Sequence, residues 1–506
     1  MPRRKVDAFF QIWNKNGTAL TFRDVRLKTR YSEVILSNID LSSRFSRNVK
    51  LKIPIISSPM DTVTEYQMAI AMAKLGGLGI IHRNLNPETQ AKHVKKVRSH
   101  LNAIVTKPTC VKPEDTVLTV KRYKAEHHLD FSSFPVVDAD GKLVGIVTKD
   151  DFDYCSNDQT AIRDIMTGQA KLITAKSNIS MKTAYKMMLE NRIKILPLVN
   201  SKYKLIGMYT LSDVKRTIEG NAENYNLDAV GNLQVGAAIG VGQDAEIRME
   251  SLNKAGINVV VIDTAHGDSQ RVIDTVKWCK KHYPNIDVVA GNVSEFDSAK
   301  HLLDIGIDGL RVGQGGGSIC STRIVAGVGC PQVTAVYNCA LALRNSGVPV
   351  CADGGLESSG DIAVALGAGA DNVMLGKLLA GTKETPGQKI YRNGVPMKAY
   401  RGMGSGSAMR DNQASRERYH QEEVVTDKLV PEGVEAVVPY KGDVEDTIDQ
   451  LLGGLRSGLG YVGAHHISEF HEQANFWRIT AAGYAESMPH GITVVDDSGF
   501  SGGRYD

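Results

Sequence analysis

A run of three glycines followed by a cysteine carries the clearest chemical signal in this 506-residue sequence. Gly315, Gly316 and Gly317 come after the short apolar segment 309–313, and Cys320 follows three residues later. Strands and helices disfavour such glycines because each costs backbone entropy, whereas a glycine loop lets backbone N–H groups approach a phosphate. A thiolate at Cys320 is then placed to attack the molecule that carries the phosphate. The spacing favours this interpretation over a glycine-rich hairpin with an incidental small cysteine.

Polar residues end other apolar runs in the same way. Asp353 precedes two glycines and is suited to hold ribose hydroxyls, with an ordinary turn carboxylate as the alternative. Gly376 and Lys377 end another run, where a backbone N–H and an ammonium group can bind a phosphate. Asp263 ends a third run, and a helix N-cap is the competing interpretation there. The other residues at such ends are Ser58, Met60, Thr264, Ala265, His266, Asn292, Gly354 and Gly355.

Strands and helices that alternate along the chain must position these residues. The apolar runs are 53–57, 78–81, 235–241, 259–263, 287–292, 309–313, 348–353 and 371–375. Helical patterns separate them at 66–75, 87–100, 243–255, 268–282, 295–305, 332–345 and 358–367. This alternation predicts an α/β fold, a (β/α)8 TIM barrel, in which the polar residues meet at the C-terminal ends of the strands. An open doubly wound sheet is the alternative, but it seldom has eight successive units.

An internal repeat explains why the alternation stops between its second and third units. Residues 135–151 (PVVDADGKLVGIVTKDD) align with residues 197–213 (PLVNSKYKLIGMYTLSD) at a constant offset of 62 residues. The repeat resembles a tandem pair of cystathionine-β-synthase (CBS)-type modules. That resemblance implies binding of ATP, GTP or another purine nucleotide, with Thr148, Asp151, Thr210 and Asp213 on ribose. The alternative is a structural repeat in which these residues only cap helices. We predict a barrel in two parts, 1–100 and 221–506, and a regulatory module at 101–220.

Composition argues against several classes of protein. With 42% hydrophobic and 23% charged residues and a net charge of +4, the chain reads as an ordinary globular protein without a dedicated nucleic-acid site. The seven cysteines have no regular spacing, which favours a reducing compartment, the cytoplasm, over a disulfide framework. The sequence has no apolar run of transmembrane length, and residues 1–17 lack the apolar core of a signal peptide, so no membrane association is expected.

The segments GGGSICSTR (315–323) and GVGCPQVTAV (327–336) resemble the active-site loop of the IMP dehydrogenase / GMP reductase family. The resemblance covers nearly the whole chain and implies that Cys320 attacks C2 of a purine, with Thr322 as a catalytic hydroxyl. Implied contacts to the substrate IMP are Ser58, Met60, Ser318, Asp353, Gly354, Gly355, Gly376, Lys377, Tyr400, Gly402, Met403, Gly404 and Glu432. Implied contacts to the cofactor NAD are Asp263, Thr264, Ala265, His266, Asn292, Gly313 and Gly315. Lys377 departs from the serine of the family pattern but keeps a cation near the phosphate dianion.

The segment 381–443 is polar and glycine-rich and lies outside the barrel count, a pattern typical of a lid or of disorder. The resemblance implies a mobile flap at about 385–443, in which Arg418 and Tyr419 activate water and Glu432 is a further catalytic residue. The residues alone favour a solvated, salt-bridging role for Arg418, because Arg416 and Glu417 are adjacent.

The flap favours NAD-dependent oxidation of IMP to XMP, a step of guanine-nucleotide biosynthesis, over the alternative, NADPH-dependent reductive deamination of GMP. That alternative is also disfavoured because GMP reductases often lack the inserted modules. A non-enzymatic nucleotide sensor is a third hypothesis. The resemblance further implies K⁺ bound by backbone carbonyls of Gly315, Gly317 and Cys320. That site would be completed by a neighbouring subunit, through its Glu486, Ser487 and His490. The resemblance therefore implies a homotetramer, or an octamer of the same chain.

Overall fold

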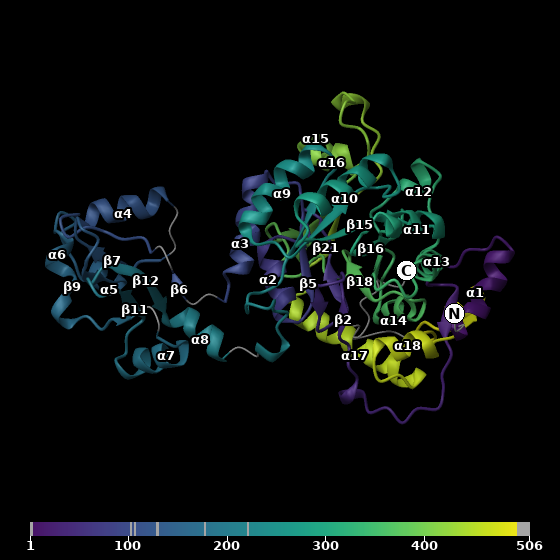
Figure 1. Ribbon diagram of the computed structural model, residues 1–506, viewed down its shortest axis with the longest axis horizontal. Coiled ribbons are helices and arrows are strands. Elements are labelled where there is room, and N and C mark those ends of the chain that lie inside the picture. Colours follow the sequence, from purple (N-terminus) through teal and green to yellow (C-terminus); the bar gives the residue numbers. More distant parts are fainter. Residues whose placement is uncertain are drawn as a thin grey trace. The chain divides into compact units, whose positions relative to one another are not determined.

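Among the described residues, eight parallel strands close into a barrel, which confirms the predicted fold (Figure 1). The computed structural model describes residues 4–101, 104–105, 108–127, 131–176, 179–219 and 222–492. In chain order the barrel strands are β4 (Ile55–Ser57), β5 (Leu78–Ile81), β13 (Gly236–Ile239), β14 (Val259–Asp263), β15 (Asp287–Val293), β16 (Gly309–Val312), β17 (Val350–Asp353) and β18 (Asn372–Leu375). Each pairs with the next in parallel register, and β18 closes the ring by pairing with β4.

Seven helices surround the strands where the periodicity predicts them, within a few residues at each end. They are α2 (Tyr66–Lys74), α3 (Pro87–Arg98), α9 (Gln243–Ala255), α10 (Gln270–His282), α11 (Phe296–Asp304), α13 (Gln332–Ala342) and α14 (Ser359–Gly367). The helix of the eighth unit, which the sequence analysis did not identify, is α17 (Val444–Val462); it packs against α14 and α2. The predicted flap is therefore inserted between β18 and its own helix.

A small hairpin closes the amino-terminal end of the barrel. It consists of β2 (Ser43–Arg44) and β3 (Lys50–Leu51), and its side chains Phe45, Val49 and Leu51 pack into the buried cluster formed by the strands. Asp287, at the start of β15, accepts hydrogen bonds from Ser46 and Asn48 of the hairpin at 2.5 and 2.8 Å. Because this end is filled, only the carboxyl ends of the strands are open to a ligand.

The chain divides into two compact units, Met1–Ser99 with Glu223–Asp506, and His100–Ala222. The second unit repeats one pattern, a helix, a hairpin and a second helix. The first copy has α4 (Val117–Glu126), β7 (Phe134–Val137), β8 (Leu143–Val147) and α5 (Lys149–Asp153); the second has α7 (Met181–Glu190), β11 (Ile195–Val199), β12 (Leu205–Thr210) and α8 (Leu211–Glu219). Pro135 pairs with Ile146 and Pro197 pairs with Met208, so the hairpins keep the sequence offset in their register. Shorter elements complete this unit: β6 (Ile104–Val105), α6 (Ile162–Ile165), β9 (Thr167–Gly168) and β10 (Ala175–Lys176).

The predicted flap segment is more regular than its composition suggests, so the expectation of an irregular segment was wrong. It forms an antiparallel sheet of β19 (Ile390–Arg392), β20 (Val395–Arg401) and β21 (Glu435–Pro439) and two short helices, α15 (Gly406–Asp411) and α16 (Gln413–Arg418). Strand β21 follows the helices, so α15 and α16 are carried on a loop whose two ends are fixed in one sheet. The sequence missed these strands because charged and glycine residues interrupt the alternation that predicts them.

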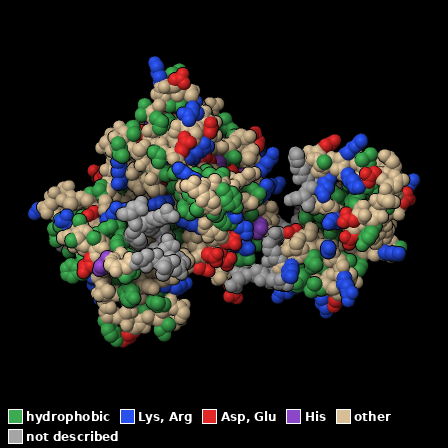
Figure 2. Space-filling model, turned by 180° about the vertical axis from the view of Figure 1, so that it is seen from behind, with side chains coloured by type: hydrophobic (Ala, Val, Ile, Leu, Met, Phe, Trp, Pro, Cys, Tyr) green, Lys and Arg blue, Asp and Glu red, His purple; other side chains and the backbone are tan. Residues whose placement is uncertain are grey.

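The described segments nearest the two ends of the chain belong to the same unit as the barrel. Helix α1 (Lys5–Lys15) is held by the Asp7–Arg344 ion pair, at 2.7 Å, and by Phe10, which stacks on Tyr337. The remaining elements are β1 (Val25–Leu27), which pairs with β22 (Phe476–Arg478), α12 (Thr322–Val325), α18 (Ile467–Gln473) and α19 (Ala481–Glu486). Figure 2 shows Lys and Arg side chains interspersed with Asp and Glu on the face that it presents. No helix within the described ranges combines the length and the apolar character needed to cross a bilayer.

Candidate active site

A cavity of about 1050 Å³ opens at the carboxyl ends of the strands and brings most of the predicted site residues together. Its size exceeds what a mononucleotide alone needs, since drug-sized ligands occupy pockets of roughly 300–1,000 Å³. The predicted residues in its wall are Ser58, Met60, Thr264, Ala265, Asn292, Gly313, Gly315, Gly317, Ser318, Cys320, Thr322, Asp353, Gly354, Gly355, Gly376, Lys377, Tyr400, Gly402, Met403, Arg418, Tyr419, Glu432 and Ser487.

Cys320 is the thiol that faces this cavity. Its Sγ lies 3.2 Å from Thr322 Oγ1, and its backbone N–H donates to the Gly317 carbonyl at 3.0 Å. By contrast Cys330, ten residues on, is buried, and burial raises the pKa of its thiol to about 11. A thiol with so high a pKa is almost entirely protonated near neutral pH and is a poor nucleophile. The geometry therefore assigns any nucleophilic role to Cys320.

The cysteine loop is tied to the flap segment by backbone hydrogen bonds. Ser321 N–H donates to the Glu432 carbonyl at 2.9 Å, and Val434 N–H donates to the Ile319 carbonyl at 3.0 Å. Any added Cβ on Gly433 would lie about 3.1–3.3 Å from backbone atoms of Ile319, Ser405 and Gly404, which leaves little room for another residue. Glu432 is thus placed in the cavity wall by main-chain pairing.

One end of the cavity gathers the groups predicted to hold a phosphate. Tyr400 lies beside Ser318, and burial raises the pKa of the Tyr400 phenol to about 12, so that it stays a hydrogen-bond donor at neutral pH. Lys377 donates to Glu357 at 2.9 Å, and Arg23 lies 3.4 Å from the same carboxylate. The sequence analysis predicted a cation at Lys377 near the phosphate. The structure also gives it an acidic neighbour, which neutralises part of its charge before any phosphate arrives.

The other end of the cavity is organised by an arginine that the sequence analysis overlooked. Arg311, in β16, is 3% exposed; its Nη1 donates to Asp263, and its Nε and Nη2 lie 2.8 Å from Asp353 Oδ2. Asn292 Nδ2 also donates to Asp353 Oδ2, at 2.8 Å. Burial lowers the pKa of Arg311, but the two carboxylates outweigh burial and raise it overall. The available signal was an arginine inside an apolar strand, which requires buried acidic partners.

The flap places Arg418 directly on the residues predicted to bind the cofactor. Its guanidinium pairs with Asp263, and its carbonyl accepts a hydrogen bond from Ala265 N–H at 3.2 Å. Burial alone would raise the pKa of Asp263, but Arg418 and Arg311 together lower it well below its usual range. Burial would likewise lower the pKa of Arg418, and Asp263 raises it overall. Arg418 is therefore a cation paired with a buried carboxylate and only 12% exposed, not the solvated side chain that the residues alone favoured.

Tyr419 lies between Arg418 and the cysteine loop. The Arg418 guanidinium carbon is 5.9 Å from the centre of the Tyr419 ring, and a Cβ on Gly404 would lie 2.5 Å from that ring. Gly404, which is not in the cavity wall, therefore makes room for Tyr419. Burial raises the pKa of Tyr419 to about 12, against the opposing effect of Arg418.

Four other predicted residues do not line the cavity. Asp263 lies beneath its wall and is fully buried. His266 is exposed, and its Nδ1 lies 3.3 Å from Nε2 of Gln314, a wall residue. Glu486 and His490 flank Ser487 in the C-terminal segment but are not in the wall themselves. Within the described ranges, no group of three or more His, Cys, Asp or Glu side chains is arranged to hold a metal ion.

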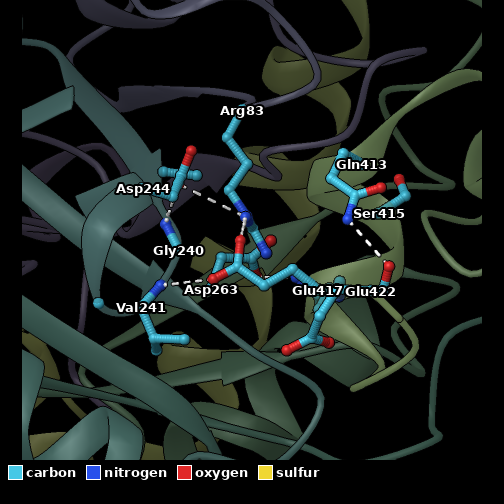
Figure 3. A network of polar contacts seen from close by, with 12 residues as sticks. Arg83, Gly240, Val241, Asp244, Asp263, Gln413, Ser415, Glu417 and Glu422 are labelled. Atoms are coloured by element: carbon cyan, nitrogen blue, oxygen red, sulfur yellow. Dashed lines mark hydrogen bonds and ion pairs between the residues drawn. The ribbon is translucent and has the colours of Figure 1, made fainter. Parts of the chain in front are cut away.

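A second ion-pair network that the sequence did not reveal fixes the flap to the barrel (Figure 3). Glu417, adjacent to Arg418, accepts a hydrogen bond from Arg83 at 2.7 Å, and Glu422 accepts one from Arg271 at 2.6 Å. Arg83 follows β5 and Arg271 is in α10, so each pair joins the flap to a different part of the barrel. The sequence analysis assigned no role to either arginine, because their partners are more than 140 residues away along the chain.

Comparison with known proteins agrees with this geometry. The sequence model of one protein family, described as the IMP dehydrogenase / GMP reductase domain, matches residues 19–490. An inosine-5′-monophosphate dehydrogenase from Aquifex aeolicus is 45% identical over 96% of this chain and 98% of its own length, and one from Staphylococcus aureus is 46% identical over 95% and 97%.

The similar solved structures include a GMP reductase. A variant of GMP reductase from Trypanosoma brucei, in complex with guanosine 5′-monophosphate, superposes with a TM-score of 0.83 at 38% identity. The match covers 95% of this chain and 100% of that one. Because it spans nearly the whole chain, the inserted unit does not separate the two activities, contrary to the argument from sequence.

Proposed function

Because the chain belongs to the IMP dehydrogenase / GMP reductase family, we propose that it oxidises IMP to XMP with NAD as the hydride acceptor. The observation that carries this choice is the Arg418–Tyr419 pair, which lines the same cavity as the Cys320 loop. A device for activating water serves the dehydrogenase reaction, in which a covalent adduct must be hydrolysed. Reductive deamination of GMP has no such hydrolysis of an oxidised adduct.

In the first half of the proposed reaction, Cys320 Sγ forms a bond to C2 of IMP, and the hydrogen on C2 leaves as hydride. NAD, when bound, supplies the electrophilic nicotinamide carbon that accepts this hydride, so the purine is oxidised by two electrons. Thr322 Oγ1, 3.2 Å from Sγ, is placed to accept or donate a proton as the thiol changes state. The purine remains attached to Cys320 as a thioimidate.

In the second half, water adds to C2 and the C2–S bond breaks, which releases XMP and the Cys320 thiol. Arg418 is held as a cation by Asp263 and thus lowers the free energy of a hydroxide-like water near it. Guanidinium groups deprotonate with difficulty, so we assign Arg418 the orientation and polarisation of water, with Tyr419 as its partner. Glu432, held in the cavity wall, is the proposed further proton carrier.

The proposed substrate contacts follow the two ends of the cavity. The phosphate is held by Ser318, Tyr400 and the backbone of Gly355 and Gly376. Lys377 adds a positive charge, which its ion pair with Glu357 partly neutralises. Asp353, fixed by Arg311 and Asn292, accepts the ribose hydroxyls. Ser58, Met60, Gly354, Gly402 and Met403 complete the substrate wall, with Gly404 behind Tyr419.

The residues proposed for NAD fit a nucleoside next to Arg418, where Asp263 and Ala265 lie. Asp263 Oδ2 and Asn292 Oδ1 are buried and have no hydrogen-bond partner among the described residues, so both can accept from ribose or carboxamide groups. Thr264, Ala265, His266, Gly313 and Gly315 surround them. Since Arg418 already contacts Asp263 and Ala265, the flap and the cofactor would use this place in turn.

We further propose a K⁺ ion at the carbonyls of Gly315, Gly317 and Cys320, because carbonyl oxygens suit a monovalent cation. Glu486, Ser487 and His490 of a neighbouring subunit would complete the site in a homotetramer. In the same proposal the inserted unit is a CBS-type pair that binds a purine nucleotide. Thr148 and Thr210 each donate to the Asp three residues on, at 2.8 and 2.6 Å, so these residues already cap helices. We expect the protein in the cytoplasm.

One assay separates the proposed function from its alternative. Purified protein is mixed with IMP and NAD in K⁺ buffer, and with GMP and NADPH in parallel, while absorbance in the nicotinamide band is followed. The dehydrogenase gives a rising signal only with IMP and NAD, and replacing K⁺ by Li⁺ slows it. A falling signal with GMP and NADPH, together with no reaction of IMP, would establish the reductase instead.

A further inference from the structure

The carboxylate of Glu417 is held in an anion site that belongs to the barrel. Its Oε2 accepts a hydrogen bond from Arg83 Nη1 at 2.7 Å, and its Oε1 accepts one from the Val241 backbone N–H at 3.1 Å (Figure 3). Arg271 Nη2 lies 3.8 Å from the same Oε1. Two guanidinium groups and one peptide N–H thus converge on a single carboxylate, a donor set that also suits a phosphate.

Two donors of this site, Arg83 and the Val241 N–H, belong to the barrel, whereas Arg271 also pairs with Glu422 of the flap. The Arg83 carbonyl accepts from Arg248 Nη2 at 3.0 Å, and Arg248 is itself held by Asp244 at 2.8 Å. Val241 is the second residue after β13. A Cβ on Gly240 would lie 2.6 Å from Arg83 Nη1 and 2.7 Å from a Glu417 oxygen, so only glycine allows the anion to approach this closely. When the flap leaves, the Glu417 carboxylate leaves with it, and Arg83 and the Val241 N–H remain on the barrel.

The Arg83 guanidinium has an N–H group that is not used in hydrogen bonding by the described residues. It is 1% exposed beneath the flap, and its Nη2 is buried without a hydrogen-bond partner among the described residues. Asp244, 3.6 Å from Nη1, is its other acidic neighbour. A buried charge that loses its main partner is destabilised by several kcal/mol in typical cases, so Arg83 needs another anion or water when Glu417 departs.

Arg418, the next residue of the flap, also forms an ion pair with the barrel, but here the flap supplies the cation and the barrel the anion. Arg418 pairs with Asp263, the residue proposed to hold the cofactor, while Glu417 pairs with Arg83. The two adjacent residues therefore place a cation and an anion on the barrel side by side. A dinucleotide offers the same combination: a cationic nicotinamide nucleoside and, next to it, an anionic diphosphate.

We propose that Arg83, the Val241 N–H and Arg271 form an anion site that Glu417 and the diphosphate of the dinucleotide occupy in turn. This inference rests on the proposed function for the identity of the dinucleotide. Glu417 then acts as an internal competitor of the cofactor, and its release is part of cofactor binding. Arg83 is a cofactor-binding residue and, with the flap closed, the anchor of the flap.

The decisive test compares two variants that both remove the Arg83–Glu417 pair. NAD is titrated calorimetrically into Arg83→Met and into Glu417→Gln, and hydrogen exchange of amides 413–422 reports flap opening. We expect faster exchange in both. Glu417→Gln should bind NAD more tightly than the unmodified chain, and Arg83→Met about tenfold more weakly, the scale of one charge-assisted hydrogen bond. If Arg83→Met also binds NAD more tightly, Arg83 only anchors the flap and the proposal is wrong.

Matched controls exclude effects of charge and of folding. Glu423→Gln removes the same charge from an exposed position of the flap and should leave NAD affinity unchanged. Arg83→Lys keeps the charge without the forked donors and should fall between the unmodified chain and Arg83→Met. A change in Glu423→Gln as large as that in Glu417→Gln would contradict a specific site.

Inorganic pyrophosphate tests the site apart from the proposed function. It should accelerate exchange at 413–422 in the unmodified chain by displacing Glu417, and should have no effect on Arg83→Met. If this result is obtained but NAD does not bind, the anion site stands and the choice of cofactor is wrong. If IMP oxidation by NAD proceeds but pyrophosphate has no effect and both variants bind NAD equally, the function stands and the anion site is wrong.

Discussion

Arg418, on the flap and in the cavity wall, forms an ion pair with Asp263, which lies at the end of β14 and is fully buried beneath that wall. Arg311 holds the same carboxylate from the barrel side. Asp263 therefore has one permanent cationic partner and one that arrives with the flap. This relationship links the two proposed half-reactions, because the contact that positions Arg418 also blocks the place proposed for NAD.

Cys320→Ser should abolish turnover, with a loss of more than about 10³-fold, because serine is a far weaker nucleophile at neutral pH. Binding of IMP should change little, since the proposed phosphate and ribose contacts come from other residues. Steady-state assays and calorimetric titration measure the two properties. Cys330→Ala is the matched control, because that thiol is buried, and it should keep most of the activity. Normal turnover by Cys320→Ser would remove Cys320 from the mechanism.

Arg418→Ala should slow hydrolysis and leave hydride transfer largely intact, because the flap is proposed to act after the nicotinamide has left. Rapid mixing with IMP and NAD should give a near-stoichiometric burst of NADH followed by very slow turnover. The Cys320 adduct should accumulate and appear as a mass shift of its peptide. Equal losses in burst and steady state would mean that Arg418 positions substrate instead.

Arg311→Met should destabilise the fold by about 3–5 kcal/mol, because it removes the buried cation that Asp263 and Asp353 share. Denaturant unfolding measures this loss. Adding Asp353→Asn should recover part of it, since Asp353 pairs with Arg311 and loses that cation, whereas Asp263 keeps Arg418. A loss below about 1 kcal/mol, the range of exposed ion pairs, would show that the network is not a stabilising element.

The unfolding free energy should fall on acidification, and Asp263 should cause part of that fall. Its pKa is lowered in the folded state, so the folded chain binds fewer protons than the unfolded one. The contribution is complete above the ordinary Asp pKa of about 3.9 and is lost as the pH falls below it. Asp263→Asn should therefore show a shallower dependence between about pH 4 and pH 2. Identical slopes for both proteins would assign the dependence to other carboxyl groups.

Replacing residues 101–220 by a short linker should leave a folded and active barrel, because the inserted unit is compact in its own right and has its own buried clusters. Any effect of ATP or GTP on activity or assembly should disappear with it. Circular dichroism, the NADH assay and size-exclusion chromatography measure these properties. A folded protein without activity in any buffer would place the inserted unit in the catalytic machinery.

The sequence alone determined the barrel and the repeat. Continuous runs of Val, Ile and Ala, such as those of β14 and β15, can be buried only in a sheet covered on both sides, and their spacing left room for one helix each. The internal repeat was readable because its hairpin residues keep a fixed offset. Helix α17 escaped prediction because more than sixty residues of flap separate it from β18, so chain order no longer indicated its place.

Sequence also located the cysteine loop, since a glycine run followed by a nucleophile is a local pattern that one segment carries entirely. Only the tertiary structure decided what the charged residues do. Arg83, Arg311 and Glu417 have ordinary neighbours along the chain, and their partners lie 42 to 334 residues away. An ion pair depends on distance and burial, and both are set when the strands close and the flap docks. For that reason the sequence predicted where the chemistry occurs, whereas the fold determined which charges control it.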